Sequence, residues 1–295
     1  MKFKPVLSYI ALILIWGFSW FAIKLQLNGT SPILSIALRF GLSAILLFAY
    51  CKIKRLPLSF PARLHFRMFF LGVTLFAGPF LLLYAASEVL PGGIVALLFS
   101  STLVFSVLAE YIFLGGKIDV YKLVSCVMGI GGLGLITLSQ VEFSSRDATF
   151  ALACGMALLG AAIGSYGGVV SANNRKLGIN LIEGNAYAMG YTALMLLFVC
   201  LLRGDSLIPN LTPIFVGAWL YLSLLASVIG FGLYLQLVQK VGLAKASYAT
   251  VLFPVVALLA SSLFEDLHWT NTMFWGIALV FIGNIALVQS KVKES

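Results

Sequence analysis

The chain has 295 residues, of which 61% are hydrophobic and only 10% are charged, and its mean hydropathy is +1.05. Since a typical soluble domain has roughly 25% charged residues, this composition excludes a soluble globular protein, a disordered chain and a disulfide-stapled secreted domain. In so apolar a chain, the net charge of +9 is better explained by the Lys and Arg excess on the cytoplasmic side of membrane proteins than by nucleic-acid binding.

Apolar runs follow one another along the whole chain, and a membrane-spanning helix needs about 20 such residues. The runs cover 5–24, 33–51, 68–87, 92–114, 119–139, 148–172, 182–202, 213–238, 244–264 and 272–289. Because unpaired backbone groups are not tolerated in lipid, each run is expected to form an α-helix. The weakest boundary separates the third and fourth runs, where Ser87, Glu88 and Pro91 are the only breakers. The sequence therefore predicts an all-α integral membrane protein with ten transmembrane helices.

The basic residues predict the orientation of these helices. With the N-terminus in the cytoplasm, the cytoplasmic segments hold 15 Lys and Arg residues and the opposite segments hold three. This asymmetry is typical of membrane proteins. It predicts a multi-pass protein of the inner (cytoplasmic) membrane with both termini in the cytoplasm. The basic face is also expected to contact anionic lipid.

Two similar stretches lie about half a chain apart. Residues 91–138 and 242–288 share a glycine-containing start, a Glu near the end of the first helix and a glycine-rich second helix. Five helices per half is an odd number, so the second half enters the membrane from the opposite side. The sequence thus predicts two inverted repeats, 1–145 and 146–295, an arrangement typical of transporters that work by alternating access.

The same stretches carry a resemblance to a known family. The relevant segments are LIWGFSWFAIK at 14–24, Ser31-Pro32, Arg39-Phe40, the region 84–117, KVGLAKA at 240–246, Phe253-Pro254 and Phe264-Glu265. They resemble EamA-type members of the drug/metabolite transporter superfamily over nearly the whole chain. The resemblance implies ten helices in two inverted five-helix repeats, a central cavity and transport without ATP. The chain departs from the family at Ser101-Thr102-Leu103, where a proline is common, at Gly115-Gly116, where Gly-Glu is common, and in the slightly displaced Glu265.

Two charged residues inside the runs need an explanation. Arg39 lies about seven residues into the second run, where a charge costs about 2.5–3.5 kcal/mol on insertion scales. It is expected either to contact a substrate carboxylate or a gate, or to snorkel or pair with a neighbouring helix in a structural role. Glu110, near the cytoplasmic end of the fourth run, is expected either to carry a coupling proton or to pair with Lys117 or Lys122.

Polar and aromatic residues within the runs are the candidates for a substrate cavity. Trp16, Ser19 and Trp20 are spaced i, i+3, i+4 and share one helix face. The other candidates are Tyr84, Ser100, Ser101, Tyr166, Tyr234, Ser247 and Tyr248. Rings mixed with hydroxyls suit a small amphipathic solute, although interfacial belts and helix packing use the same residue types. Pro79 and Pro254 fall inside runs and are expected to kink their helices.

The sequence carries no sign of catalysis, cofactor or metal. Residues 129–134 match GxGxxG formally, but they lie inside an apolar run without the strand that a dinucleotide site requires. P-loop, HExxH and GxSxG motifs and CxxC pairs are missing from the sequence, so we expect a non-enzyme without cofactor or metal.

The predicted function is secondary transport of small metabolites, namely amino acids or related amphipathic compounds. Import or exchange of a nucleoside-like metabolite such as S-adenosylmethionine is an alternative, and a channel or a structural membrane protein is an alternative of another class. The expected partners are a small-molecule substrate and the lipid bilayer, without nucleic acid. One copy is sufficient to enclose a site, and a dimer is compatible with the sequence.

Overall fold

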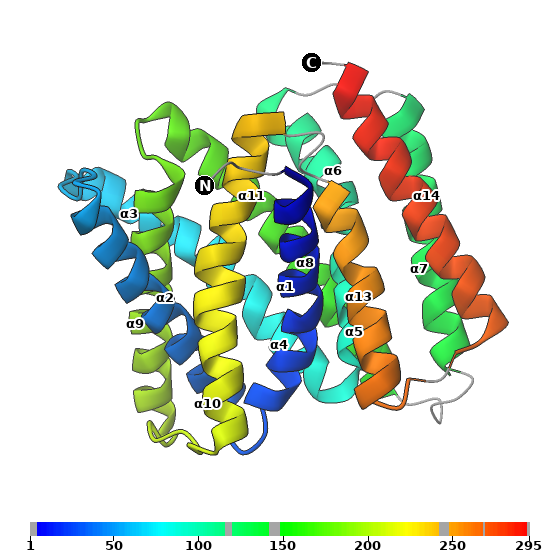
Figure 1. Cartoon of the computed structure of the whole chain (residues 1–295), viewed down its shortest axis with the longest axis horizontal. Coiled ribbons are helices and arrows are strands. Elements are labelled where there is room, and N and C mark those ends of the chain that lie inside the picture. Colours follow the sequence, from blue (N-terminus) through cyan, green and yellow to red (C-terminus); the bar gives the residue numbers. More distant parts are fainter. Residues whose placement is uncertain (1–4, 116–119, 142–147, 242–247, 268, 294–295) are drawn as a thin grey trace.

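A computed structural model describes residues 5–115, 120–141, 148–241, 248–267 and 269–293, and all regular structure within them is helical (Figure 1). The helices are α1 (Pro5–Gln26), α2 (Pro32–Ile53), α3 (Ala62–Leu71), η1 (Gly72–Ala77), α4 (Gly78–Val89), α5 (Gly92–Phe99), α6 (Thr102–Leu114), α7 (Val120–Val141), α8 (Ala148–Lys176), α9 (Leu181–Arg203), α10 (Pro213–Leu220), η2 (Tyr221–Ile229), α11 (Gly230–Val241), α13 (Tyr248–Phe264) and α14 (Asn271–Lys293).

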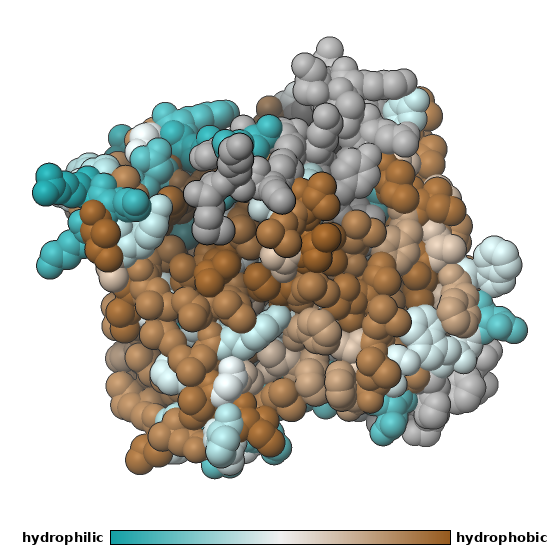
Figure 2. Space-filling model, viewed as in Figure 1, coloured by the Kyte–Doolittle hydropathy of each residue, from teal (hydrophilic) through white to brown (hydrophobic). Residues whose placement is uncertain are grey.

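The outer surface of this bundle is apolar. Seven helical segments of the described chain are long and apolar enough to cross a membrane, and Val120–Ile136, Leu252–Phe264 and Asn271–Ala286 are shorter apolar helices. Hydrophobic side chains cover the middle of the face in Figure 2, and hydrophilic ones lie toward its margins, most of them at the upper left. Leu263 is 76% exposed and Ile53 is 77% exposed, which water would disfavour and lipid would not. The chain is therefore a multi-pass membrane protein.

Local chemistry sets the helix ends that frame the bundle. The Ser31 hydroxyl accepts a hydrogen bond from the Leu34 N–H before α2, and the Thr212 hydroxyl accepts one from the Phe215 N–H before α10. In both cases a proline follows the cap and supplies a φ suited to the first helical turn. Gly204 ends α9 in the left-handed region, at φ 69°, where a residue without Cβ fits best.

Two spans contain a π-helical segment that the sequence did not predict. In η1 and η2 the hydrogen bonds run to the fifth preceding residue, as from the Gly78 N–H to the Val73 carbonyl and from the Gly230 N–H to the Leu225 carbonyl. Pro79, which has no N–H, is the second residue of α4, after Gly78. Pro254 lies inside α13, and the helix continues through it. A π segment does not change the apolar pattern, so hydropathy cannot reveal it.

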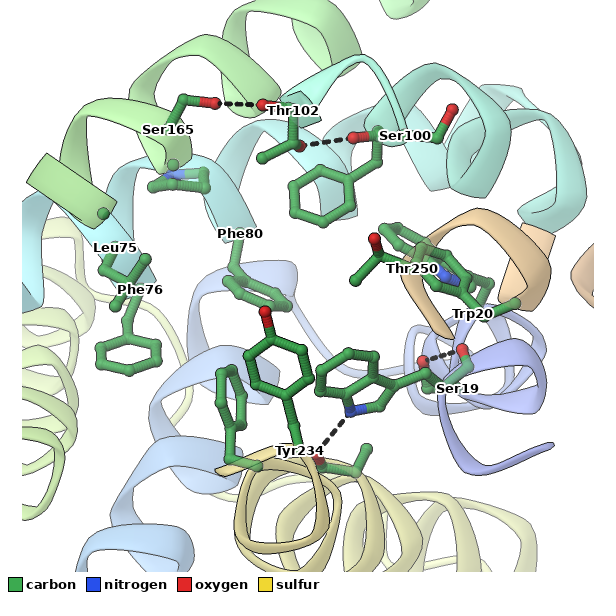
Figure 3. A pocket seen from close by; sticks show the side chains of 18 of the residues that line it. Ser19, Trp20, Leu75, Phe76, Phe80, Ser100, Thr102, Ser165, Tyr234 and Thr250 are labelled. Carbon is green, nitrogen blue, oxygen red and sulfur yellow. Dashed lines mark hydrogen bonds between the residues drawn. The ribbon is translucent and has the colours of Figure 1, made fainter. Parts of the chain in front are cut away.

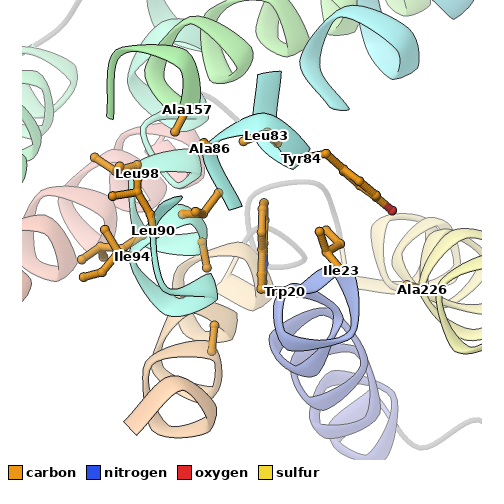
Figure 4. Packing of buried hydrophobic residues seen from close by; sticks show 14 of the residues in the cluster. Trp20, Ile23, Leu83, Tyr84, Ala86, Leu90, Ile94, Leu98, Ala157 and Ala226 are labelled. Atoms are coloured by element: carbon orange, nitrogen blue, oxygen red, sulfur yellow. The ribbon is translucent and has the colours of Figure 1, made fainter. Parts of the chain in front are cut away.

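The bundle has two helix pairs at its ends and a packed centre. The pair of α2 and α9 lies at one end, the pair of α7 and α14 lies at the other, and α1, α5, α8 and α13 lie between them (Figure 1). In the centre, Trp20 and Ile23 of α1 face Leu83 and Leu90 of the α4 region and Ile94 of α5 (Figure 4). These five side chains are at most 6% exposed, so they belong to the hydrophobic core.

Two pairs of elements recur along the chain with the same spacing. The segments η1 and η2 begin 149 residues apart, as do α2 and α9. The contacts recur too. The Ser43 hydroxyl of α2 donates to the Ser223 carbonyl of η2 at 3.1 Å, and the Thr192 hydroxyl of α9 donates to the Gly72 carbonyl of η1 at 3.0 Å. Ser43 and Thr192 are themselves 149 positions apart. The two halves of the described chain thus contact each other reciprocally.

Glycine permits a close helix approach between α7 and α14. A Cβ added at Gly132 would lie 2.5 Å from the Gly276 carbonyl oxygen, and one added at Gly276 would lie 2.6 Å from the Gly132 carbonyl oxygen. A Cβ at the neighbouring Gly131 would meet nothing within 4 Å. Packing on one face of α7 therefore explains Gly132, whereas Gly131 and Gly134 have open space around their Cβ positions.

We predict that Gly132→Ala destabilises the folded protein by about 1–3 kcal/mol, because the added methyl group forces α7 and α14 apart. Gly131→Ala, on the same helix with the same chemical change, should be neutral or slightly stabilising, because alanine favours the helix. Thermal unfolding of both variants in detergent measures the difference. Equal melting temperatures for the two variants would contradict this account of the contact.

Candidate functional site

A cavity of about 380 Å³ lies at the centre of the bundle (Figure 3). Small-molecule sites usually measure about 300–1,000 Å³, so the space suits a small solute. Its walls come from α1, α2, η1, α4, α5, α6, α8, η2, α11 and α13. Helices from both halves of the chain therefore line it.

Eight of the 22 residues that line the cavity are aromatic. Trp16 lies 5.6 Å from Tyr234 and 6.3 Å from Phe253 between ring centroids, and Trp20 stacks on Phe253 at 6.3 Å. The Trp16 indole N–H donates to the Ala226 carbonyl at 3.2 Å, which fixes its ring in the wall. In Figure 3 the Tyr234 ring points into the cavity toward Phe80. A solute here would meet rings from α1, η1, α4, α5, α11 and α13.

The helix that begins at Gly92 is interrupted at the cavity. Residues 100 and 101 form a turn between α5 and α6. The hydroxyls of Ser100 and Ser101 donate to the carbonyls of Leu97 and Leu98, each at 2.6 Å, and the Thr102 hydroxyl donates to the Phe99 carbonyl. Such side-chain bonds to preceding carbonyls favour a bend. Ser100 and Thr102 line the cavity at this bend.

Arg39 is the buried cation of the site. It lines the cavity with 4% of its surface exposed. Its Nε donates to the Ser227 hydroxyl at 3.2 Å and its Nη1 to the Tyr84 hydroxyl at 3.4 Å. Its guanidinium carbon lies 4.7 Å from the Phe80 ring centroid and 5.2 Å from that of Phe40. Phe80 thus forms part of the wall and also contacts the cation.

A polar network behind the cavity holds Arg39 in place. The Tyr84 hydroxyl donates to Gln26 Oε1 at 2.9 Å, and Gln26 Nε2 donates to the Ser35 carbonyl at 3.0 Å. The Ser43 hydroxyl shares its one proton between the Arg39 carbonyl at 2.8 Å and the Ser223 carbonyl at 3.1 Å. Gln26, Tyr84, Ser35 and Ser43 are all completely buried. The network therefore ties α1, α2 and α4 together around one charge.

Hydrogen bonds between the halves also close the end of the bundle where α5 begins. Glu265 Oε2 accepts from the Gly92 N–H at 2.6 Å and from the Ser261 hydroxyl at 2.7 Å. Ser261 Oγ in turn accepts from the Gly93 N–H at 2.6 Å. A carboxylate and a hydroxyl thereby satisfy N–H groups that the start of a helix leaves without partners.

Several residues singled out in the sequence line this cavity together: Trp16, Ser19, Trp20, Arg39, Pro79, Ser100 and Tyr234. Other candidates lie elsewhere. Tyr84 lies behind Arg39, Ser101 borders a separate hollow between α6 and α7, and the Tyr166 ring packs against Phe70 and Phe113. The half-buried Glu110 lies outside the lining. Ser247 and the side chain of Tyr248 lie outside the described residues.

Further lining residues were not predicted: Phe80, Phe99, Thr102, Ser106, Ser165, Thr250 and Phe253. Thr250 and Phe253 are spaced i, i+3 and share a helix face, a signal as good as that of Trp16 and Ser19. Phe80 and Phe99 look like any lipid-facing phenylalanine in sequence. Among the described residues, no three His, Cys, Asp or Glu side chains are placed to hold a metal ion.

Comparisons with known proteins agree on one family. The sequence profile of the EamA-like transporter family matches residues 3–138 and again 151–289. The "Uncharacterized transporter YoaV" of Bacillus subtilis strain 168 is 25% identical over 95% of both chains. The "Uncharacterized inner membrane transporter YedA" of Escherichia coli K12 is 26% identical over 88% of this chain and 83% of its own. Protein PecM of Dickeya dadantii is 24% identical over 99% and 96%.

The fold has a solved counterpart. A structure described only as "Crystal structure of protein" superposes with a TM-score of 0.68 over 99% of both chains, at 17% sequence identity. At this identity the likeness concerns the fold alone.

We predict that Tyr84→Phe destabilises the protein by about 1–3 kcal/mol, because Gln26 Oε1 loses its buried donor and Arg39 loses an acceptor. Tyr111→Phe is the matched control, since Tyr111 is 54% exposed and its hydroxyl bonds to no described residue. Unfolding in detergent should separate the two variants. An unchanged melting temperature in Tyr84→Phe would show that the network does not hold the site.

Proposed function

Because the chain belongs to the EamA-like transporter family, we propose that it is a secondary transporter that moves small metabolites across the cytoplasmic membrane through the central cavity. The observation that carries the proposal is that the two segments matched by the family profile, 3–138 and 151–289, jointly enclose this cavity. A cavity between two halves is where alternating access places a substrate.

We propose that the halves are inverted five-helix repeats, 1–145 and 146–295, with ten transmembrane helices in all. The constant spacing of 149 residues between η1 and η2 supports this division. So do the reciprocal bonds of Ser43 with η2 and of Thr192 with η1. In this mechanism, the Glu265 and Ser261 contacts with the start of α5 close one end of the cavity, and they would break when that end opens.

We propose that both termini are cytoplasmic. Exposed Lys52, Lys54, Arg55 and Arg63 lie at the end of α2 and the start of α3. The end of α2, the start of α1 and the end of α14 all lie in the upper half of the bundle in Figure 1. Short loops rich in Lys and Arg stay in the cytoplasm, which supports this orientation.

For the substrate, we propose amino acids or related amphipathic compounds. The aromatic wall of Trp16, Trp20 and Phe253 suits an apolar body, and the hydroxyls of Ser19 and Ser100 suit a polar group. S-adenosylmethionine-like metabolites are the alternative cargo, and the panel in the experiment below includes them.

We predict accelerated counterflow of one group of solutes in proteoliposomes that hold the purified full-length protein, tested with labelled amino acids and nucleoside-like metabolites. Gly168→Phe should lower the initial rate by about tenfold or more, equivalent to about 1.4 kcal/mol of activation free energy. The reason is that Gly168 lines the cavity and a Cβ there meets nothing within 4 Å, so the ring would fill the solute's space.

Gly155→Phe is the control, because Gly155 lies on the same helix, is exposed outside the cavity and also has an open Cβ position. It should transport at the wild-type rate. Flux without counterflow would indicate a channel. Equal rates in the Gly168 and Gly155 variants would place the transport path outside the cavity.

A further inference from the structure

The charge of the cavity is unbalanced. Arg39 is the charged side chain of the lining, and the described residues that line the space include no Asp or Glu. Within the described chain, Arg39 takes part in no ion pair closer than 4.0 Å, and its hydrogen-bond partners, Ser227 and Tyr84, are neutral. A solute in this cavity therefore meets a net positive charge.

This charge cannot be removed by losing a proton. A guanidinium group stays protonated in proteins, whereas a buried lysine can become neutral. The faces of Phe40 and Phe80 and the two hydroxyls compensate the charge in part. A buried cation without a carboxylate partner remains costly, so an anion that enters the cavity is favoured there.

The hydrogen-bond geometry leaves capacity for such an anion. A guanidinium has five N–H donors in a planar fork. In Arg39, the Nε–H bonds to Ser227 and one Nη1–H bonds to Tyr84 at the long distance of 3.4 Å. The remaining donors have no acceptor among the described residues. The fork of a guanidinium matches the two oxygens of a carboxylate better than it matches a neutral amide or an alcohol.

We propose that Arg39 is the anchor for a single carboxylate of the transported solute, and that the apolar body of the solute lies against Trp16, Trp20 and Phe253. This inference rests on the proposed function and adds a substrate class to it, namely small monocarboxylates with an apolar or aromatic body. One fixed cation balances one negative charge, so solutes with a net positive charge are rejected.

The test measures binding and needs no flux. The purified full-length protein in neutral detergent is titrated with three probes that share one body: 3-phenylpropanoate, 3-phenylpropanamide and 3-phenylpropylamine. Calorimetry gives the dissociation constants. We expect the wild type to bind the carboxylate at least about tenfold more tightly than the amide, a gain of the size that a charged hydrogen-bonded pair provides, and the amine more weakly than both.

Variants separate the charge from the structure around it. In Arg39→Gln the preference for the carboxylate over the amide should disappear, and in Arg39→Lys a smaller preference should remain. Arg203→Gln is the matched control, because it removes the same charge from an exposed site on α9 and should leave the preference unchanged. Arg39→Lys keeps a positive charge at the site, so its reduced preference tests the inference even if Arg39→Gln fails to fold.

Three outcomes would overturn the inference: a wild type that binds the amide as tightly as the carboxylate, a wild type that binds none of the probes, or an Arg39→Gln variant that keeps the preference. A protein that prefers the carboxylate in detergent but shows no flux in proteoliposomes would refute the transport proposal and leave the anchor intact. The two failures are therefore distinguishable.

Discussion

The structure depends on one constraint, that the hydrocarbon core of a bilayer offers no hydrogen bonds to the backbone. Helices satisfy it along most of the chain, and irregular backbone is confined to places where the protein itself supplies partners. The turn at 100–101 is bonded by its own serine hydroxyls. The carbonyls of Gly72 in η1 and Ser223 in η2 receive hydroxyls from the opposite half. The irregular segments thus gather around the central cavity, where a transporter needs shape and polar atoms.

The same constraint makes Arg39 the residue of the site whose burial costs the most free energy. A neighbouring carboxylate would have balanced its charge, but the described surroundings supply hydroxyls and aromatic faces instead. These contacts hold the guanidinium in place without neutralising it. If Arg39 served only the structure, an ion pair with a carboxylate would stabilise the fold more, because a buried charge without its partner is left uncompensated. The unbalanced charge makes functional sense when the missing partner arrives with the solute.

The sequence predicted the helices well and the site in part, for different physical reasons. Hydropathy located α2 at 33–51 against the observed Pro32–Ile53, because apolar length is what lipid selects. It placed the start of the third span at 68 instead of Ala62, since Arg63 and Arg67 interrupt the apolar pattern of α3.

Within the site, helical spacing put Trp16, Ser19 and Trp20 on one face, and all three line the cavity. Tyr84 and Tyr166 were chosen by residue type alone, which does not say where a side chain points. Tyr84 packs behind the cavity wall and Tyr166 packs away from it.

The most direct test of a solute-binding cavity between the halves is thiol labelling in membranes with a water-soluble maleimide. The labelled variant is Ser106→Cys, at a position that lines the cavity, and Gly155→Cys is the control. We predict that Ser106→Cys reacts and that 3-phenylpropanoate slows the reaction, while Gly155→Cys is unaffected by the probe. Labelling at Ser106→Cys that proceeds at the same rate with and without the probe would contradict the account.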